Sequence, residues 1–181
     1  MKTDRALKEI EGEKILLRPI TLDDTPLIVK WRNNPSVMKN FIFRQTFTDQ
    51  MHINWMNTKV ASGEVIQYVA IEKVTGRPIG SVYYRDIDTD YNSAEFGIFI
   101  GEDDARGQGF GKEMTRLFTK YGLSELGFHR IQLRLLAANE AAYKTYEDAG
   151  FVKEGVFHDM VKLDGSYQDV IFMAIVDGKR E

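Results

Sequence analysis

The stretch "RGQGFGKE", residues 106–113, holds three glycines in five positions, and a lysine follows the last of them. Glycine lets the backbone approach a ligand closely and adopt left-handed conformations. A helix is expected to begin inside the stretch, because apolar residues follow at helical spacing. These residues are Phe110, Met114, Leu117, Phe118 and Tyr121. The first N–H groups of a helix lack partners within it and attract anions, so the stretch predicts a phosphate-binding loop.

The spacing of these glycines excludes two common nucleotide loops. A P-loop reads G-x-x-x-x-G-K followed by Ser or Thr. Counting back from Gly111 and Lys112 places Arg106 where the first glycine is required and Glu113 where the hydroxyl is required. The dinucleotide-binding pattern G-x-G-x-x-G also fails, because the third glycine is missing from either starting glycine. The phosphate therefore belongs to another kind of ligand.

The elements around the loop mix strands and helices within one domain. Periodicity and turn residues predict strands at 14–20, 64–73, 77–87, 92–101, 130–137, 151–163 and 166–176, and helices at 21–34, 48–63 and 139–150. No repeat, low-complexity tract or linker divides the chain. We therefore expect a single α+β domain at 14–181. A charged extension at 1–13, frayed or forming a short helix, is expected before it.

Two spaced motifs resemble those of the GNAT acetyltransferase superfamily. Arg106, Gly109 and Gly111 satisfy the pattern Q/R-x-x-G-x-G/A, which is similar to the coenzyme A pyrophosphate loop of that superfamily. Residues 139–151 satisfy a second pattern, N-x-x-A-x-x-x-Y-x-x-x-G-F. The resemblance covers residues 14–176. It implies the GNAT fold, with a mixed and mainly antiparallel sheet flanked by helices, and acetyl transfer from acetyl-CoA to a primary amine in a ternary complex.

The resemblance also implies which residues hold the acetyl-CoA. The pyrophosphate is expected to meet mainly the backbone N–H groups of Arg106, Gly107, Gln108, Gly109, Gly111 and Lys112. The strand before the loop splays from its neighbour in this family, so N–H groups near Ile98 and Phe99 are expected to meet the thioester and the pantetheine arm. Asn139 has two roles open: it caps a helix, or it also contacts the pantetheine arm.

Two residues are candidates for the chemistry. Tyr146 stands where the family carries the tyrosine that lies near the CoA sulfur, so it is the candidate general acid; the alternative is a packed helix residue. Glu95 lies between Ala94 and Phe96 on the strand that leads to the loop. It is the candidate general base, directly or through a water; the alternative is a cross-strand ion pair.

The acceptor side is expected to involve Trp31, Arg32, His52 and Trp55. The segment "KWRNNPSV" at 30–37, with His52 and Trp55 after it, resembles acetyltransferases that act on nucleotide-linked amino sugars. Arg32 is the candidate phosphate contact, and Trp55 is the candidate for stacking on a sugar or base. The plainer alternatives are a core position for Trp31, a solvated helix position for Arg32 and an exposed helix position for His52.

Three acceptor classes remain open at this point. The closing segment 155–173 resembles ribosomal-protein N-terminal acetyltransferases and spermidine acetyltransferases. A small-molecule amine, with an amino sugar foremost, is therefore the first expectation. A protein N-terminus or a polyamine is the second. A non-catalytic CoA-binding module is the alternative of another class.

Composition excludes several other functions. The net charge is −3, so no nucleic-acid partner is expected. The chain has no cysteine and three widely spaced histidines, so no metal site is expected. No apolar run approaches the roughly 20 residues that span a bilayer, and the N-terminus has no apolar signal region. A cytoplasmic enzyme is expected, as a monomer or as a homodimer joined through the apolar segment 170–176.

Overall fold

The structure is a computed structural model, and it describes residues 7–178. It confirms the predicted fold class. One sheet runs through the described chain in the order β1-β2-β3-β4-β5-β6-β8-β7. The strands are β1 (Ile10–Glu11), β2 (Ile15–Pro19), β3 (Ile66–Glu72), β4 (Pro78–Asp88), β5 (Ser93–Ile100), β6 (Arg130–Leu136), β7 (Val152–Leu163) and β8 (Ser166–Val176). Every neighbouring pair is antiparallel except β5 and β6, which are parallel.

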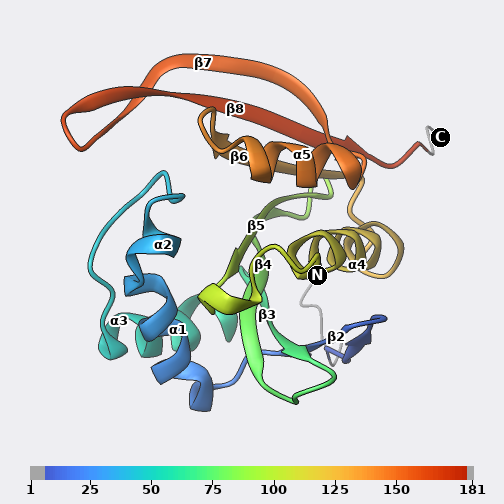
Figure 1. Cartoon of the computed structure of the whole chain (residues 1–181). Helices are drawn as coiled ribbons and strands as arrows, with labels where there is room; N and C mark the ends of the chain where they lie inside the picture. Colours follow the sequence, from blue (N-terminus) through green and yellow to red (C-terminus); the bar gives the residue numbers. More distant parts are fainter. Residues whose placement is uncertain (1–6, 179–181) are drawn as a thin grey trace.

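Helices cover both faces of this sheet (Figure 1). One face carries α1 (Thr25–Asn33), α2 (Pro35–Met38) and α3 (Asp49–Trp55), and the other carries α4 (Phe110–Ser124) and α5 (Glu140–Asp148). Three short helical turns complete the list: η1 (Leu22–Asp24), the π-helical η2 (Met56–Val60) and η3 (Asp103–Ala105). The α4 side encloses the larger apolar core, around Phe118 and Tyr84, and the α1 side a smaller one, around Trp31 and Phe99.

Local capping explains where the helices begin. The Thr48 hydroxyl accepts a hydrogen bond from the N–H of Met51, and the Asn139 side chain accepts one from the N–H of Ala142. Each bond satisfies an N–H group that has no partner inside its helix. Gly109 precedes α4 with φ of 86°, a left-handed conformation that favours glycine. These starts agree with the sequence prediction.

Three predicted boundaries were wrong. Ile10 and Glu11 form a strand paired with β2, so this part of the predicted extension is neither frayed nor helical; residues 1–6 of it lie outside the described residues. The helix predicted at 21–34 starts four residues later as α1, because η1 comes first. The helix predicted at 48–63 ends at Val60 in a π-helical turn. In residues 7–178, the helices are too short or too polar to cross a membrane.

Candidate active site

The sheet opens between β5 and β6. Their parallel pairing consists of three register pairs and stops at Glu95 and Gln132. Beyond this point β5 pairs with β4 alone, and β6 pairs with β8 alone. The opening leaves a strand edge whose backbone groups can bind an extended ligand as a further strand would.

The direction of each N–H group on β5 follows from one bond. The N–H of Gly101 donates to the carbonyl of Ile79 on the β4 side, at 2.8 Å. In an antiparallel pair, consecutive residues direct their N–H groups to opposite sides. Ile98 and Ile100 therefore direct theirs into the opening, and Phe99 directs its own toward β4. The expectation for Ile98 fits this geometry, whereas Phe99 contributes a buried ring packed edge-on to Trp31.

The glycine loop follows β5 and leads into α4. Gly107 and Gly109 have φ of 74° and 86°. A Cβ added at Gly107 would meet no atom within 4 Å, and one at Gly111 would meet nothing nearer than Ile100, at 3.9 Å. The space over these glycines, together with the start of a 15-residue helix, fits an anionic group such as a pyrophosphate.

Side chains of the loop hold the backbone in place. The Arg106 guanidinium donates to the carbonyl of Ile100 at 3.1 Å and pairs with Asp103 at 2.9 Å. The Gln108 amide donates to the carbonyl of Asp104 at 2.6 Å. The side chains of Arg106 and Gln108 are thus engaged within the loop. A contact from their backbone N–H groups to a pyrophosphate stays a prediction.

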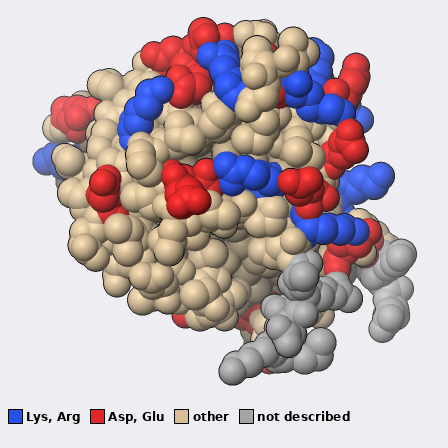
Figure 2. Space-filling view, turned by 90° about the horizontal axis from the view of Figure 1, so that it is seen from below, with Lys and Arg blue, Asp and Glu red and all other residues tan. Residues whose placement is uncertain are grey.

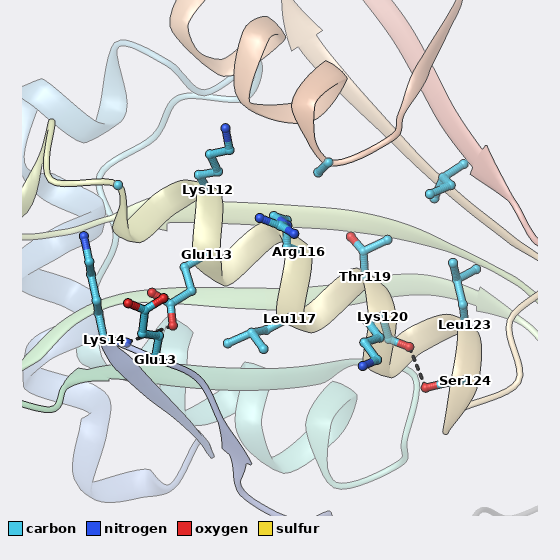
Figure 3. Close-up of a pocket in the computed structure, with 13 residues that line it drawn as sticks. Glu13, Lys14, Lys112, Glu113, Arg116, Leu117, Thr119, Lys120, Leu123 and Ser124 are labelled. Carbon is cyan, nitrogen blue, oxygen red and sulfur yellow. Dashed lines mark hydrogen bonds between the residues drawn. The ribbon is translucent and has the colours of Figure 1, made fainter.

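An open pocket of about 820 Å³ runs from Gly109 along the outer surface of α4. Figure 3 shows Lys112 projecting from α4 toward α5, where its ammonium group lies 2.7 Å from Asp148. Lys14 reaches the loop from the bend just before β2, and its Nζ lies 3.4 Å from the carbonyl of Gln108. Arg116 lines the same pocket, one helical turn after Lys112. Neither Lys14 nor Arg116 was predicted from the sequence; only the i, i+4 spacing from Lys112 could have indicated Arg116.

Tyr146 lies on α5 against the core. Its ring packs against Phe96 and Phe151, with centroids 6.1 Å and 6.0 Å away. Burial raises the pKa of the Tyr146 hydroxyl above its usual range, and the neighbouring Tyr83 raises it further. The hydroxyl therefore keeps its proton at neutral pH, which is the protonation state that a general acid needs.

Glu95 is held by two arginines from the neighbouring strands. Arg85 on β4 donates to one carboxylate oxygen. Arg134 on β6 donates to both oxygens, at 3.0 and 3.1 Å. The Glu95 side chain is only 11 % exposed. The cross-strand ion pair that the sequence left open is therefore present, and a base role would require Glu95 to leave both partners.

Arg32 projects from α1 between two aromatic rings. Its guanidinium carbon lies 4.6 Å from the ring centroid of Phe41 and 4.8 Å from that of Phe47. Its Nε is buried and has no hydrogen-bond partner. Desolvation lowers the pKa of Arg32, and the positive charge of Arg85 acts in the same direction. Arg32 is thus not the solvated helix residue of the plainer alternative.

The other expected acceptor contacts differ in accessibility. Trp31 is fully buried, with its indole N–H 2.7 Å from Glu102. His52 is 1 % exposed and its Nδ1 lies 2.9 Å from the Thr25 hydroxyl. Burial lowers the pKa of His52, so it stays neutral. Neither side chain is open to an acceptor in this conformation. The histidine is a core residue rather than the exposed one of the plainer alternative.

Trp55 is partly exposed beside Arg85. Its indole N–H donates to the Gln67 side chain at 3.1 Å. Trp55 and Arg85 both line a second pocket, of about 210 Å³. The volume lies below the range of roughly 300–1,000 Å³ common for small-ligand pockets, so it suits only part of an acceptor.

Strand alternation places Tyr83, Arg85 and Glu95 on one face of the sheet. Tyr83 lies opposite Gly97 and Arg85 lies opposite Glu95 across β4 and β5. We call Arg32, Arg85 and Arg134 the arginine cluster. Arg85 and Arg134 were not predicted from the sequence, although their period-2 spacing with Tyr83 and Gln132 was a usable signal.

Within residues 7–178, no three His, Cys, Asp or Glu side chains group in a way that could hold a metal ion.

Comparisons with known proteins agree with this geometry. The family model described as acetyltransferase (GNAT) domain matches residues 14–152. The uncharacterized N-acetyltransferase p20 of Bacillus licheniformis is 28 % identical over 179 residues, covering 97 % of this chain and 98 % of its own. Spermidine N(1)-acetyltransferase of Vibrio cholerae is 27 % identical over 168 residues, which cover 93 % of this chain and 96 % of the relative. A solved structure of a Vibrio cholerae spermidine N-acetyltransferase with CoA and spermine has a TM-score of 0.85 at 26 % identity, covering 91 % of this chain and 96 % of that one.

Proposed function

The chain belongs to the GNAT acetyltransferase family of acetyl-CoA-dependent N-acetyltransferases, and we propose that its acceptor is the primary amine of a small molecule. A nucleotide-linked amino sugar is the first candidate. The observation that carries the proposal is the opening between β5 and β6. It lies between the glycine loop and Tyr146 on one side and the arginine cluster on the other. A donor and an acceptor can thus meet across one strand edge.

The donor side would be held mainly by backbone groups. The N–H groups of the loop from Arg106 to Gly111 bind the pyrophosphate, and the N–H of Ile98 binds the arm that lies in the opening. Lys112 adds positive charge at the start of α4. Acetyl-CoA supplies the thioester, whose C–S bond breaks as the C–N bond to the acceptor forms. Asn139 caps α5 and so holds the helix that carries Tyr146.

Tyr146 would donate a proton to the departing thiolate. Its raised pKa keeps the proton in place until the thiolate forms. The thiolate leaves as a thiol, and Tyr146 regains a proton from solvent.

Glu95 would act as a positioning residue rather than as the base. Its carboxylate is occupied by Arg85 and Arg134, so its role is to hold both arginines at the face of the sheet. The excess of positive charge there disfavours a bound ammonium ion and lowers the pKa of the acceptor amine. The amine would then lose its proton to water before it attacks.

A polyamine is the second candidate acceptor. It is favoured by the similarity to the Vibrio cholerae spermidine acetyltransferase, which extends over 93 % of this chain. It is opposed by the three arginines, because a polyamine carries several positive charges of its own.

The test is release of free CoA thiol from acetyl-CoA with a panel of amines. The panel contains glucosamine, spermidine, an amino-sugar nucleotide and a peptide with a free N-terminus. We expect turnover above the acceptor-free rate with a small-molecule amine. Tight CoA binding in calorimetry without turnover on any amine would instead indicate a non-catalytic CoA-binding module. Turnover of the peptide alone would move the acceptor to protein N-termini.

A further inference from the structure

The charge on the acceptor side is unbalanced. Two guanidinium groups, those of Arg85 and Arg134, share one buried carboxylate, that of Glu95. The third, that of Arg32, has no carboxylate partner among residues 7–178. Asp86 lies 3.6 Å from Arg85, but its side chain is 70 % exposed, so water screens most of its charge. His52 is neutral and adds no charge. The local sum is about two positive charges. The face seen in Figure 2 differs, because acidic and basic side chains lie side by side on it.

Arg32 makes the imbalance costly to the free protein. Its Nε is shut off from solvent without a hydrogen-bond partner. Desolvation lowers the pKa of Arg32, Tyr83 raises it in part through a hydrogen bond, and no carboxylate is among the groups that shift it within residues 7–178. Burying a guanidinium without a counter-ion costs free energy, because the charge loses its hydration. The two flanking phenylalanine rings offset only part of that cost. A bound anion would offset more of it.

Arg85 and Arg134 can reach such an anion. Their side chains are 39 % and 30 % exposed, so each has N–H groups that Glu95 does not use. Both stand on central strands, and the shared carboxylate fixes their spacing. Arginine forks bind carboxylate and phosphate groups through paired hydrogen bonds.

We infer that the acceptor amine carries an anionic group, a carboxylate or a phosphate, which binds the arginine cluster while the amine faces the opening between β5 and β6. The inference rests on the proposed function for the amine. The anion-binding residues stand independently of it. The excess positive charge selects against polyamines and neutral amines, so the acceptor class differs from that named for the Vibrio cholerae relative.

The first experiment compares matched acceptors that differ by one anionic group. Glucosamine 6-phosphate is set against glucosamine, and 4-aminobutyrate against 4-aminobutyramide, with spermidine as the cationic probe. We expect at least one anionic member to exceed its neutral partner about 10- to 100-fold in kcat/KM, the worth of a charged hydrogen bond. The phosphate and carboxylate pairs separate the two sources of the anion. Equal rates within both pairs, or a preference for spermidine, would overturn the inference while acetyl transfer stands.

The second experiment changes the arginines. Arg85→Gln and Arg134→Gln are expected to remove that preference mainly by raising KM, and Arg134→Lys to restore part of it. Arg130→Gln is the matched control. Arg130 lies on the same strand and face as Arg134, but pairs with Glu154 away from Glu95. Thermal melts check that each variant folds. An unchanged preference in folded Arg85→Gln and Arg134→Gln would overturn the assignment.

A binding measurement separates the two proposals. Calorimetry titrates glucosamine 6-phosphate and 4-aminobutyrate into protein saturated with CoA, so that the glycine loop is already filled. Binding to the wild type and to Arg130→Gln, but not to Arg134→Gln, supports the anion site even if no acetylation occurs. In that outcome the anion site stands, and only the proposed acetylation of a small-molecule amine fails. No binding of either probe to the wild type overturns the anion site.

Discussion

Tyr146 is the residue on which the proposed chemistry depends most. Its ring is fixed by Phe96 and Phe151, and its hydroxyl stays protonated because burial raises its pKa. Tyr143 lies one turn earlier on α5 and also packs against the core. The two tyrosines share a helix, and both are partly buried. They therefore form a matched pair for separating catalysis from packing.

We predict that Tyr146→Phe lowers kcat by about 10²- to 10⁴-fold, the usual contribution of a general acid, and leaves CoA affinity nearly unchanged. The reason is that Phe keeps the packed ring and removes only the proton donor. Steady-state rates of thiol release and CoA calorimetry measure the two effects. Tyr143→Phe should retain a rate near that of the wild type. Equal losses in the two variants would assign both tyrosines to packing.

At the scale of an element, α4 combines a structural and a binding role. Its hydrophobic side packs Met114 and Phe118 into the larger core, and its N-terminus faces the glycine loop. Glu113 in the first turn also accepts a hydrogen bond from the N–H of Lys14, at 3.0 Å, which ties β2 to the helix. The N-terminus is therefore held in position before any anion binds.

We predict that Gly111→Glu raises the Kd for CoA at least 100-fold, because its carboxylate competes with the pyrophosphate for the same N–H groups. The fold should survive, since a Cβ at this position has room and an acidic side chain suits the first turn of a helix. Calorimetry gives the Kd, and the Tm reports the fold. Gly111→Ala is the control and should change the Kd less than tenfold. An unaltered Kd in the glutamate variant would remove the loop from the CoA site.

At the scale of the whole molecule, the sheet is interrupted where β5 meets β6. Three register pairs join the strands β1 to β5 with the strands β6 to β8 at that point. The larger apolar core, around Phe118, contains residues from both groups of strands and so joins them. A ligand that fills the opening would add backbone contacts on the exposed edge of β5. It would stabilise the assembly of the two halves as well as bind the donor.

We predict that CoA at about 100 times its Kd raises the Tm by roughly 5–11 °C, from about 2.7 kcal/mol of linked binding energy. Hydrogen exchange followed by NMR should show slower exchange at Ile98 and little change at Phe99, whose N–H already faces β4. Adenosine 3′,5′-diphosphate, which lacks the pantetheine arm, is the control and should leave Ile98 unprotected. Protection of Phe99 instead of Ile98 would contradict the strand phase derived from Gly101.

The sequence by itself determined the features that depend on neighbouring residues. The missing glycines around Gly109 and Gly111 excluded other phosphate loops, because spacing along the chain sets where each N–H group lies. The caps at Thr48 and Asn139 were predictable for the same reason, since a cap binds an N–H only a few residues away. The fold class followed from the order of such local elements. The family resemblance rested on two local motifs, one at Arg106, Gly109 and Gly111 and the other at 139–151.

Only the tertiary structure decided which side chains meet on the sheet. Glu95 is joined to Arg134 across 39 positions of sequence, and Arg32 reaches the same face from a helix. Local pattern left Glu95 open as base or ion pair. It left Trp31 open as acceptor contact or core residue, and His52 open as acceptor contact or exposed helix residue. Their burial depends on how α1 and α3 pack on β4 and β5. That packing is set by long-range apolar contacts, which the spacing within any one segment does not encode.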